Sequence, residues 1–114
     1  MKEVEDNGFI KYDSGKPKYH LIPPRELKQL AKILTFGAEK YGENNWKLCE
    51  NPERYVSALF RHVEAFREGQ ALDDETRMPH LAHALCCCLF ILYFDNERRE
   101  NGIDRVGPNG SRKA

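Results

Sequence analysis

Apolar side chains recur at three- and four-residue spacing in two stretches of the chain, and this spacing predicts two amphipathic helices. The first helix begins at Pro24 and ends at Gly42, with an apolar stripe of Leu27, Leu30, Ala31, Leu34, Ala38 and Tyr41. The second opens at Asn51 and Pro52 and ends near Gly69, with a stripe of Tyr55, Val56, Leu59, Phe60, Val63 and Phe66. Proline suits a first helical turn and glycine commonly ends a helix, so the boundaries agree with the periodicity.

A third helix is predicted to start around Pro79, and it is apolar on nearly every side. One face carries Leu81, Leu85, Cys88, Leu89 and Leu92, while Phe90, Ile91 and Phe94 occupy other faces. A helix of this kind is normally buried, either centrally within a chain or in an oligomer. Since three helices with such a last member give one chain a thin core, we expect a homo-oligomer, either a dimer or a tetramer.

The remaining segments lack helical periodicity. Residues 1–23 mix glycine and proline with scattered charges, which predicts an extended arm without strands. Residues 97–114 gain glycine, proline and asparagine, which predicts a mobile tail. The 114 residues are therefore expected to form a single all-α domain, a small helical bundle with its helical core at residues 24–96.

Charge and cysteine usage narrow the class of protein. Lysine plus arginine and aspartate plus glutamate both number 18, so direct binding to nucleic acid is not expected. Cys86, Cys87 and Cys88 are consecutive on a helix and point in different directions, which is typical of reduced thiols in a cytoplasmic protein. The apolar run at residues 81–94 is too short to span a bilayer and no apolar signal region opens the chain, so we expect no membrane association.

Three of the four histidines fall within residues 61–85, around an acidic run. They are His62, His80 and His83, and the acids are Asp73, Asp74 and Glu75. An antiparallel hairpin of the second and third helices brings His62 and His80 to the same end, with the acids at its mouth. Oxygen ligands there could hold a hard cation while imidazoles orient a water or contact a phosphate. Alternatively, an aspartate caps the third helix and the histidines are satisfied core or inter-subunit residues.

Other residues are candidates for binding a nucleotide. Lys16 lies on the arm between Lys11 and Lys18, and Arg61 points away from the stripe of the second helix, so each is either a phosphate ligand or merely solvated. Trp46, beside Asn45 in a turn, could stack on a base while the asparagine reads its edge, or it could fill the core.

Four stretches together carry a resemblance. KYDSGKPKYHLIPP, LTFGAEKYGENNWK, LFRHVEAFREGQALDDET and PHLAHAL, in this order, resemble the dATP/dGTP diphosphohydrolase N-terminal family, found mostly in bacteriophages and prophages. The resemblance covers residues 11–92, most of the chain. It implies an all-α fold related in chemistry to the MazG-like pyrophosphohydrolases, which use Mg²⁺ or Mn²⁺ to cut a nucleoside triphosphate to the monophosphate and pyrophosphate. For a phage-encoded protein, the expected compartment is the host cytoplasm.

The resemblance also implies a set of site residues. They are Gly15, Lys16, Lys40, Tyr41, Asn45, Trp46, Arg61, His62, Asp73, Glu75, His80 and His83. Our leading hypothesis gives the metal to Asp73, Glu75, His80 and His83, and gives catalysis to His62, Asp73 and Glu75. The purine nucleotide is bound by Lys16, Lys40, Tyr41, Asn45, Trp46 and Arg61, with the three cations on the phosphates and Trp46 and Asn45 on the base.

Two other hypotheses follow from the residues. The chain has Gln70 where family members often have an acid and Cys87 where they often have asparagine, which favours a non-catalytic nucleotide binder. A zinc-stabilised structural module using the three histidines and Cys87 is also conceivable, although the chain lacks paired Cys-x-x-Cys elements.

Overall fold

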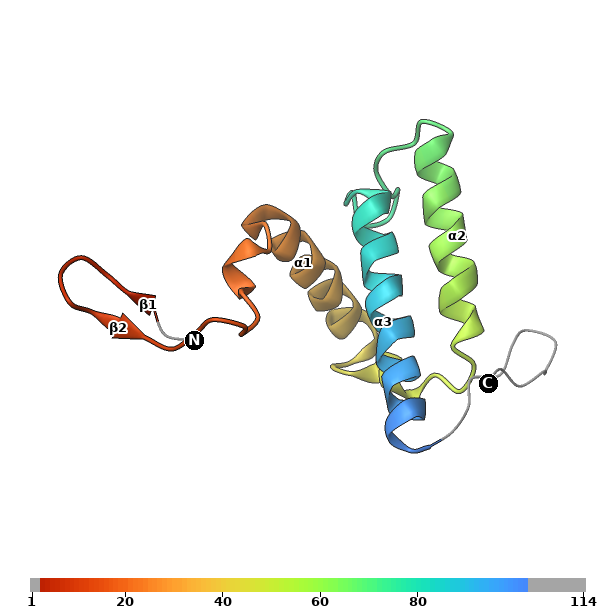
Figure 1. Ribbon diagram of the computed structural model, residues 1–114. Coiled ribbons are helices and arrows are strands. Elements are labelled where there is room, and N and C mark those ends of the chain that lie inside the picture. The colour runs from red at the N-terminus through yellow and green to blue at the C-terminus, as the bar shows by residue number, and fades with distance from the viewer. Residues whose placement is uncertain (1–2, 103–114) are drawn as a thin grey trace.

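A computed structural model describes residues 3–102 as a three-helix arrangement with an N-terminal arm (Figure 1). In chain order its elements are β1 (Glu3–Val4), β2 (Ile10–Lys11), the 3-10 helix η1 (Tyr19–Leu21), α1 (Pro24–Tyr41), the 3-10 helix η2 (Asn45–Leu48), α2 (Glu53–Arg67) and α3 (His80–Glu100). The predicted small all-α bundle is confirmed, and the three helices begin where the sequence places them.

The helix ends follow local chemistry. Pro24 occupies the first turn of α1, and the N–H of Gly42 donates to the carbonyl of Ala38 to close its last turn. Helix α3 runs to Glu100, four residues past the predicted end of the core at residue 96. An ion pair between Arg99 and Asp95 at 2.9 Å supports this extra turn, where arginine also favours the C-terminal helix dipole. The predicted tail from residue 103 onward lies outside the described residues.

Helix α3 is the central element, with α2 antiparallel beside it and α1 packed on it as well (Figure 1). The core consists of Ile33, Ala82 and Cys86, with Leu30, Leu34, Met78 and Phe90 packed against them. The buried side of α3 is thus made of small residues, Ala82, Ala84, Cys86 and Cys87, which let its neighbours approach closely. Its leucines lie elsewhere: Leu81 is 46% exposed and Leu92 is 55% exposed.

The expectation that the arm contains no strand is wrong. β1 and β2 pair antiparallel with Val4 opposite Ile10, across a turn in which Gly8 adopts a φ of 89°. The Asn7 side chain accepts a hydrogen bond from the Phe9 N–H at 3.0 Å and fixes this turn. Two-residue strands are too short to leave an alternating pattern, and for this reason the sequence did not indicate them.

No helix within residues 3–102 combines the length and the apolar character that crossing a membrane requires.

Candidate functional site

The loop between α2 and α3 holds its polar side chains on a fixed backbone. A bridge pairs Leu72 with Pro79, and the Asp73 N–H donates to the carbonyl of Met78 at 2.8 Å. The N–H of His80 donates to the carbonyl of Ala71 at 2.8 Å, which ties the start of α3 to the loop. Because these bonds close the loop on itself, Asp73 and the histidines project from a preorganised frame.

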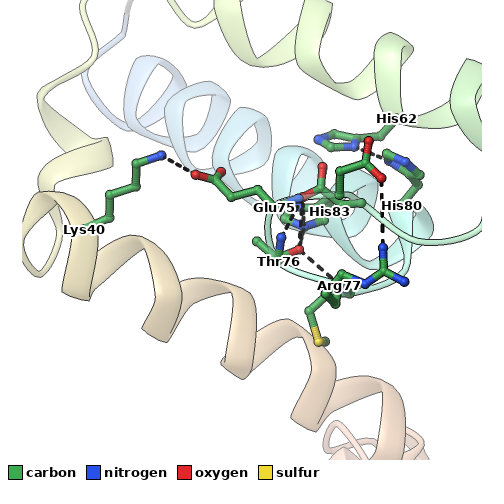
Figure 2. A network of polar contacts seen from close by, with 10 residues as sticks. Lys40, His62, Glu75, Thr76, Arg77, His80 and His83 are labelled. Carbon is green, nitrogen blue, oxygen red and sulfur yellow. Dashed lines mark hydrogen bonds and ion pairs between the residues drawn. The ribbon is translucent and has the colours of Figure 1, made fainter.

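Three side chains converge at this end of the helical hairpin. The Nδ1 atoms of His62 on α2 and His80 on α3 lie 2.8 Å apart (Figure 2). One ligand atom from each of His62, Asp73 and His80 lies within 4.8 Å of the other two. We call these three residues the His–Asp cluster. It joins the two helices and the loop that connects them, as the sequence predicted for His62 and His80.

Asp73 is held as a carboxylate by the loop. One of its oxygens accepts hydrogen bonds from the N–H groups of Thr76 at 2.9 Å and Glu75 at 3.1 Å, and from the Thr76 hydroxyl at 3.2 Å. Burial works to raise the pKa of Asp73, but these hydrogen bonds and the nearby His83 outweigh it and lower the pKa below its ordinary value. The group therefore stays ionised at neutral pH.

His83 supports the cluster without belonging to it. Its ring stacks on His62 with centroids 4.7 Å apart, and its Nε2 lies 2.7 Å from the Thr76 hydroxyl and 3.9 Å from Asp73. Burial, followed by the neighbouring histidines, lowers the pKa of His62, and burial lowers the pKa of His83 although Asp73 opposes it. Both rings are neutral at pH 7, which is the form that binds metals.

These lowered pKa values predict that acid destabilises the metal-free protein. The unfolded chain takes up protons on His62 and His83 near pH 6.5, whereas the folded chain resists them until a lower pH. The stability that these two histidines contribute is thus complete above pH 6.5 and falls as the pH drops below it, until the lower pKa values of the folded chain are passed. Urea unfolding in EDTA at several pH values measures this, and the double variant His62→Gln/His83→Gln should show a flatter profile. An unchanged profile in the variant would contradict the assignment.

The donor set of the cluster fits a divalent cation. Adjacent ligands of a six-coordinate ion at about 2.1 Å lie about 3 Å apart, and the two Nδ1 atoms are 2.8 Å apart. His80 is only 6% exposed, and its Nε2 is buried with no hydrogen-bond partner within residues 3–102. Two imidazoles beside one carboxylate are ligands typical of Mn²⁺, Fe²⁺, Co²⁺ or Zn²⁺ rather than of Mg²⁺, which prefers oxygen.

Glu75 lies outside this donor set. Its carboxylate accepts a hydrogen bond from the Lys40 ammonium at 2.8 Å and points toward α1 (Figure 2). The hydrogen bond to Glu75 raises the pKa of Lys40. Of the four residues predicted to hold metal, the structure therefore groups Asp73 and His80, and it adds His62, which the sequence placed among the catalytic residues.

The zinc-module hypothesis loses support from the position of Cys87. Burial, followed by the adjacent Cys88, raises the pKa of this thiol to about 11, so it stays protonated at neutral pH. Among the described residues, Cys87 is not grouped with the histidines as a possible set of metal ligands, and this geometry is what weighs against the zinc module.

A hollow of about 850 Å³ opens between α1, α2 and α3. Four predicted nucleotide-binding residues line it: Tyr41, Asn45, Trp46 and Arg61. Arg61 adjoins His62 on α2, but none of the three residues of the His–Asp cluster lines the hollow. Sequence reasoning missed Arg54 and Tyr55, which also line the hollow. Arg54 lies seven residues, or two turns, before Arg61, and this spacing would have placed both on one helix face.

Trp46 takes the packing role that the sequence offered as one of two alternatives, while its stacking on a base stays a prediction. Its ring stacks on Phe90 with centroids 4.3 Å apart and meets the edge of Tyr93 at 4.9 Å. The Tyr55 hydroxyl donates to the Trp46 carbonyl at 3.3 Å. The indole is thus part of an aromatic cluster that attaches η2 to α3, and it also lines the hollow.

Gly15 and Lys16 are the predicted site residues that the structure does not bring to the others. They form a turn in which the Lys16 N–H donates to the Asp13 carbonyl at 3.1 Å. Every residue from position 3 to position 25 is exposed, and the hairpin extends away from α2 and α3 (Figure 1).

The fold and the cluster define a small α-helical protein with a candidate divalent-metal centre and a polar and aromatic hollow between its helices. Residues 7–105 match the family described as dATP/dGTP diphosphohydrolase, N-terminal, and the chain belongs to this family. A protein of Salmonella phage PMBT28 named dATP/dGTP diphosphohydrolase is 39% identical over 89 residues. The match covers 78% of this chain but only 30% of that relative. No solved structure matches the chain.

Proposed function

We propose that this chain is the metal-dependent catalytic part of a pyrophosphohydrolase that converts purine deoxynucleoside triphosphates to monophosphates and pyrophosphate. The observation that carries the proposal is the convergence of His62, Asp73 and His80, with Arg61, the residue before His62 on α2, lining the hollow. The family membership and the name of the phage relative support a nucleotide substrate and a diphosphohydrolase reaction.

The cluster would hold one divalent cation, and its donor set favours Mn²⁺ over Mg²⁺. A bound cation would supply Lewis-acid chemistry, neutralising charge on the phosphates and promoting ionisation of the attacking water. The chain itself contributes the preorganised Asp73 carboxylate, the neutral His62 imidazole and the buried His80 ring, so little reorganisation is needed when a cation enters.

The surrounding residues take complementary roles. Arg61 faces the hollow and would bind the phosphates in the bidentate manner that a guanidinium allows. Glu75 lies outside the donor set, and its pairing with Lys40 keeps a carboxylate at the loop where it could accept a proton from the attacking water. Asn45 and Trp46 line the other part of the hollow, where a base would stack and present its polar edge.

Incubation of the purified protein with each common dNTP and NTP, in Mn²⁺, Mg²⁺ or EDTA, tests this proposal. Ion-exchange chromatography should show dAMP or dGMP with pyrophosphate, fastest in Mn²⁺ and absent in EDTA, with dCTP and dTTP largely intact. Intact nucleotides under every condition would refute the catalytic proposal. Tight binding of an unhydrolysed nucleotide in that case would identify the non-catalytic binder instead.

A further inference from the structure

The arm, residues 3–23, presents an apolar surface that no other part of residues 3–102 covers. Seven large apolar side chains on it are exposed: Val4 (59%), Phe9 (54%), Ile10 (47%), Tyr12 (60%), Tyr19 (78%), Leu21 (70%) and Ile22 (46%). At about 200 Å² for a fully exposed side chain of this size, they offer on the order of 800 Å² to a partner. A standard protein interface takes about 800 Å² from each side, so the arm is nearly sufficient as one half of an interface.

The hairpin at the tip of the arm also needs a partner. Two strands of two residues each do not form a stable unit in water on their own. Figure 1 shows this hairpin beyond α1, on the side away from α3 and α2. The hairpin would therefore be stable if the apolar side chains of the arm were buried against another molecule.

The exposed side of α3 indicates that this molecule is a second copy of the chain. Leu81, Leu85, Cys88 and Leu92 follow one another at spacings of four, three and four residues, and all four are exposed. This is the spacing by which two helices pack side by side, and an identical partner matches it about a twofold axis.

The positions of the positively charged side chains relate this pairing of two chains to the phosphate-binding site. Near the His–Asp cluster, Lys40 is paired with Glu75, Arg67 with Glu64 and Arg77 with Asp74, which leaves Arg61 outside these pairs. Arg54 also lines the hollow, two turns of α2 away from Arg61. A nucleoside triphosphate carries several negative charges and requires more than one cation to hold it. Lys11, Lys16 and Lys18 make no ion pair within residues 3–102, and they lie on the arm, away from the cluster of their own chain.

We propose that two copies of this chain pair, and that the arm of each lies on the other so that Lys16 completes the phosphate site beside the partner's His–Asp cluster. The role of Lys16 rests on the proposed function, whereas the pairing rests on the exposed surfaces alone. The site is then shared, with the cluster and Arg61 from one copy and the arm from the other.

Zero-length cross-linking tests the pairing without any activity. Chains labelled with ¹⁴N and ¹⁵N are mixed in equal amounts, unfolded, refolded together and treated with a carbodiimide, which joins lysine amines to nearby carboxylates. Mass spectrometry should find arm lysines joined to acids of the loop, Asp74 or Glu75, with about half of these pairs of mixed isotope. Arm-to-loop pairs that are never mixed, or a monomer by light scattering at micromolar concentration, would overturn the proposal.

Mixing two defective variants tests the shared site. Lys16→Ala removes the arm cation, and Asp73→Asn damages the cluster; each should hydrolyse nucleotide poorly alone. Refolded together in equal amounts, half of the dimers carry one intact site, so activity should return to about a quarter of wild type. Lys28→Ala, which removes an exposed lysine of α1, serves as the matched control and should retain full activity. Its equal mixture with Asp73→Asn should show only the activity of the Lys28→Ala chains present.

The outcomes separate the two proposals. No recovery in a mixture that forms mixed dimers would show that the arm acts within its own chain and would overturn the shared site. A wild-type protein that hydrolyses no nucleotide refutes the proposed function, while the isotope experiment still decides whether the arm crosses to a second copy.

Discussion

The Asp73→Asn variant should lose divalent-metal binding and nucleotide hydrolysis by more than about 100-fold, because changes to groups that merely support a metal ligand already cost 10- to 100-fold. Asparagine keeps the shape of the side chain and an oxygen that can accept the N–H of Thr76, so the loop should remain folded. It removes the negative charge, which is the property that a divalent cation requires.

Asp74→Asn is the matched control. This neighbour has the same chemistry, but its side chain is 89% exposed and only a long ion pair of 3.9 Å joins it to Arg77. The variant should keep hydrolysis and metal affinity within about twofold of the wild type, as exposed surface pairs contribute little. Metal titration by calorimetry and steady-state kinetics measure both variants. Equal losses in the two, or none in either, would contradict the assignment of Asp73 to the cluster.

The Trp46→Ala variant should lose about 3 kcal/mol of stability, lowering Tm by about 10 to 20 °C. Removing the indole opens a space against Phe90 and Tyr93 and releases η2 from α3. Trp46→Phe retains an aromatic ring on Phe90 and should lose only about 1 kcal/mol. Urea unfolding followed by circular dichroism measures the difference.

The same pair of variants separates packing from base recognition. If Trp46 also stacks on the base, Trp46→Phe should raise KM for dGTP several-fold at a temperature where the variant is fully folded, with kcat little changed. A stability of Trp46→Ala within about 0.5 kcal/mol of wild type would contradict the packing role. An unchanged KM in the phenylalanine variant would restrict Trp46 to that packing role.

The helices could be read from the sequence because apolar spacing and terminal residues agree there. Pro24, Gly42 and Pro79 mark boundaries by backbone chemistry alone, and the structure places the helices accordingly. The buried side of α3 could not be read in the same way, since the helix is apolar on nearly every side. The face of α3 that packs on the other helices is the one with small residues such as Ala82 and Cys86. Hydrophobicity alone would have predicted that the leucines are buried, but they are exposed.

The sequence predicted which residues form the candidate site better than it predicted which of them contact one another. The hairpin geometry brings His62 and His80 together, as their positions on two antiparallel helices implied. The loop conformation is what separates Asp73 from Glu75: hydrogen bonds to Thr76 turn one carboxylate toward the imidazoles, and Lys40, from a distant helix, takes the other. Such long-range partners leave no periodic signal in the sequence.

The central claim, that His62, Asp73 and His80 form a divalent-metal centre, is tested most directly by titrating the purified protein with Mn²⁺ and following free Mn²⁺ by electron paramagnetic resonance. The account predicts one tightly bound Mn²⁺ per chain, lost in both His62→Ala and His80→Ala and retained in His20→Ala, which removes the exposed histidine of η1. Mn²⁺ that stays free with the wild-type protein, or that binds the two cluster variants as tightly as the wild type, would contradict it.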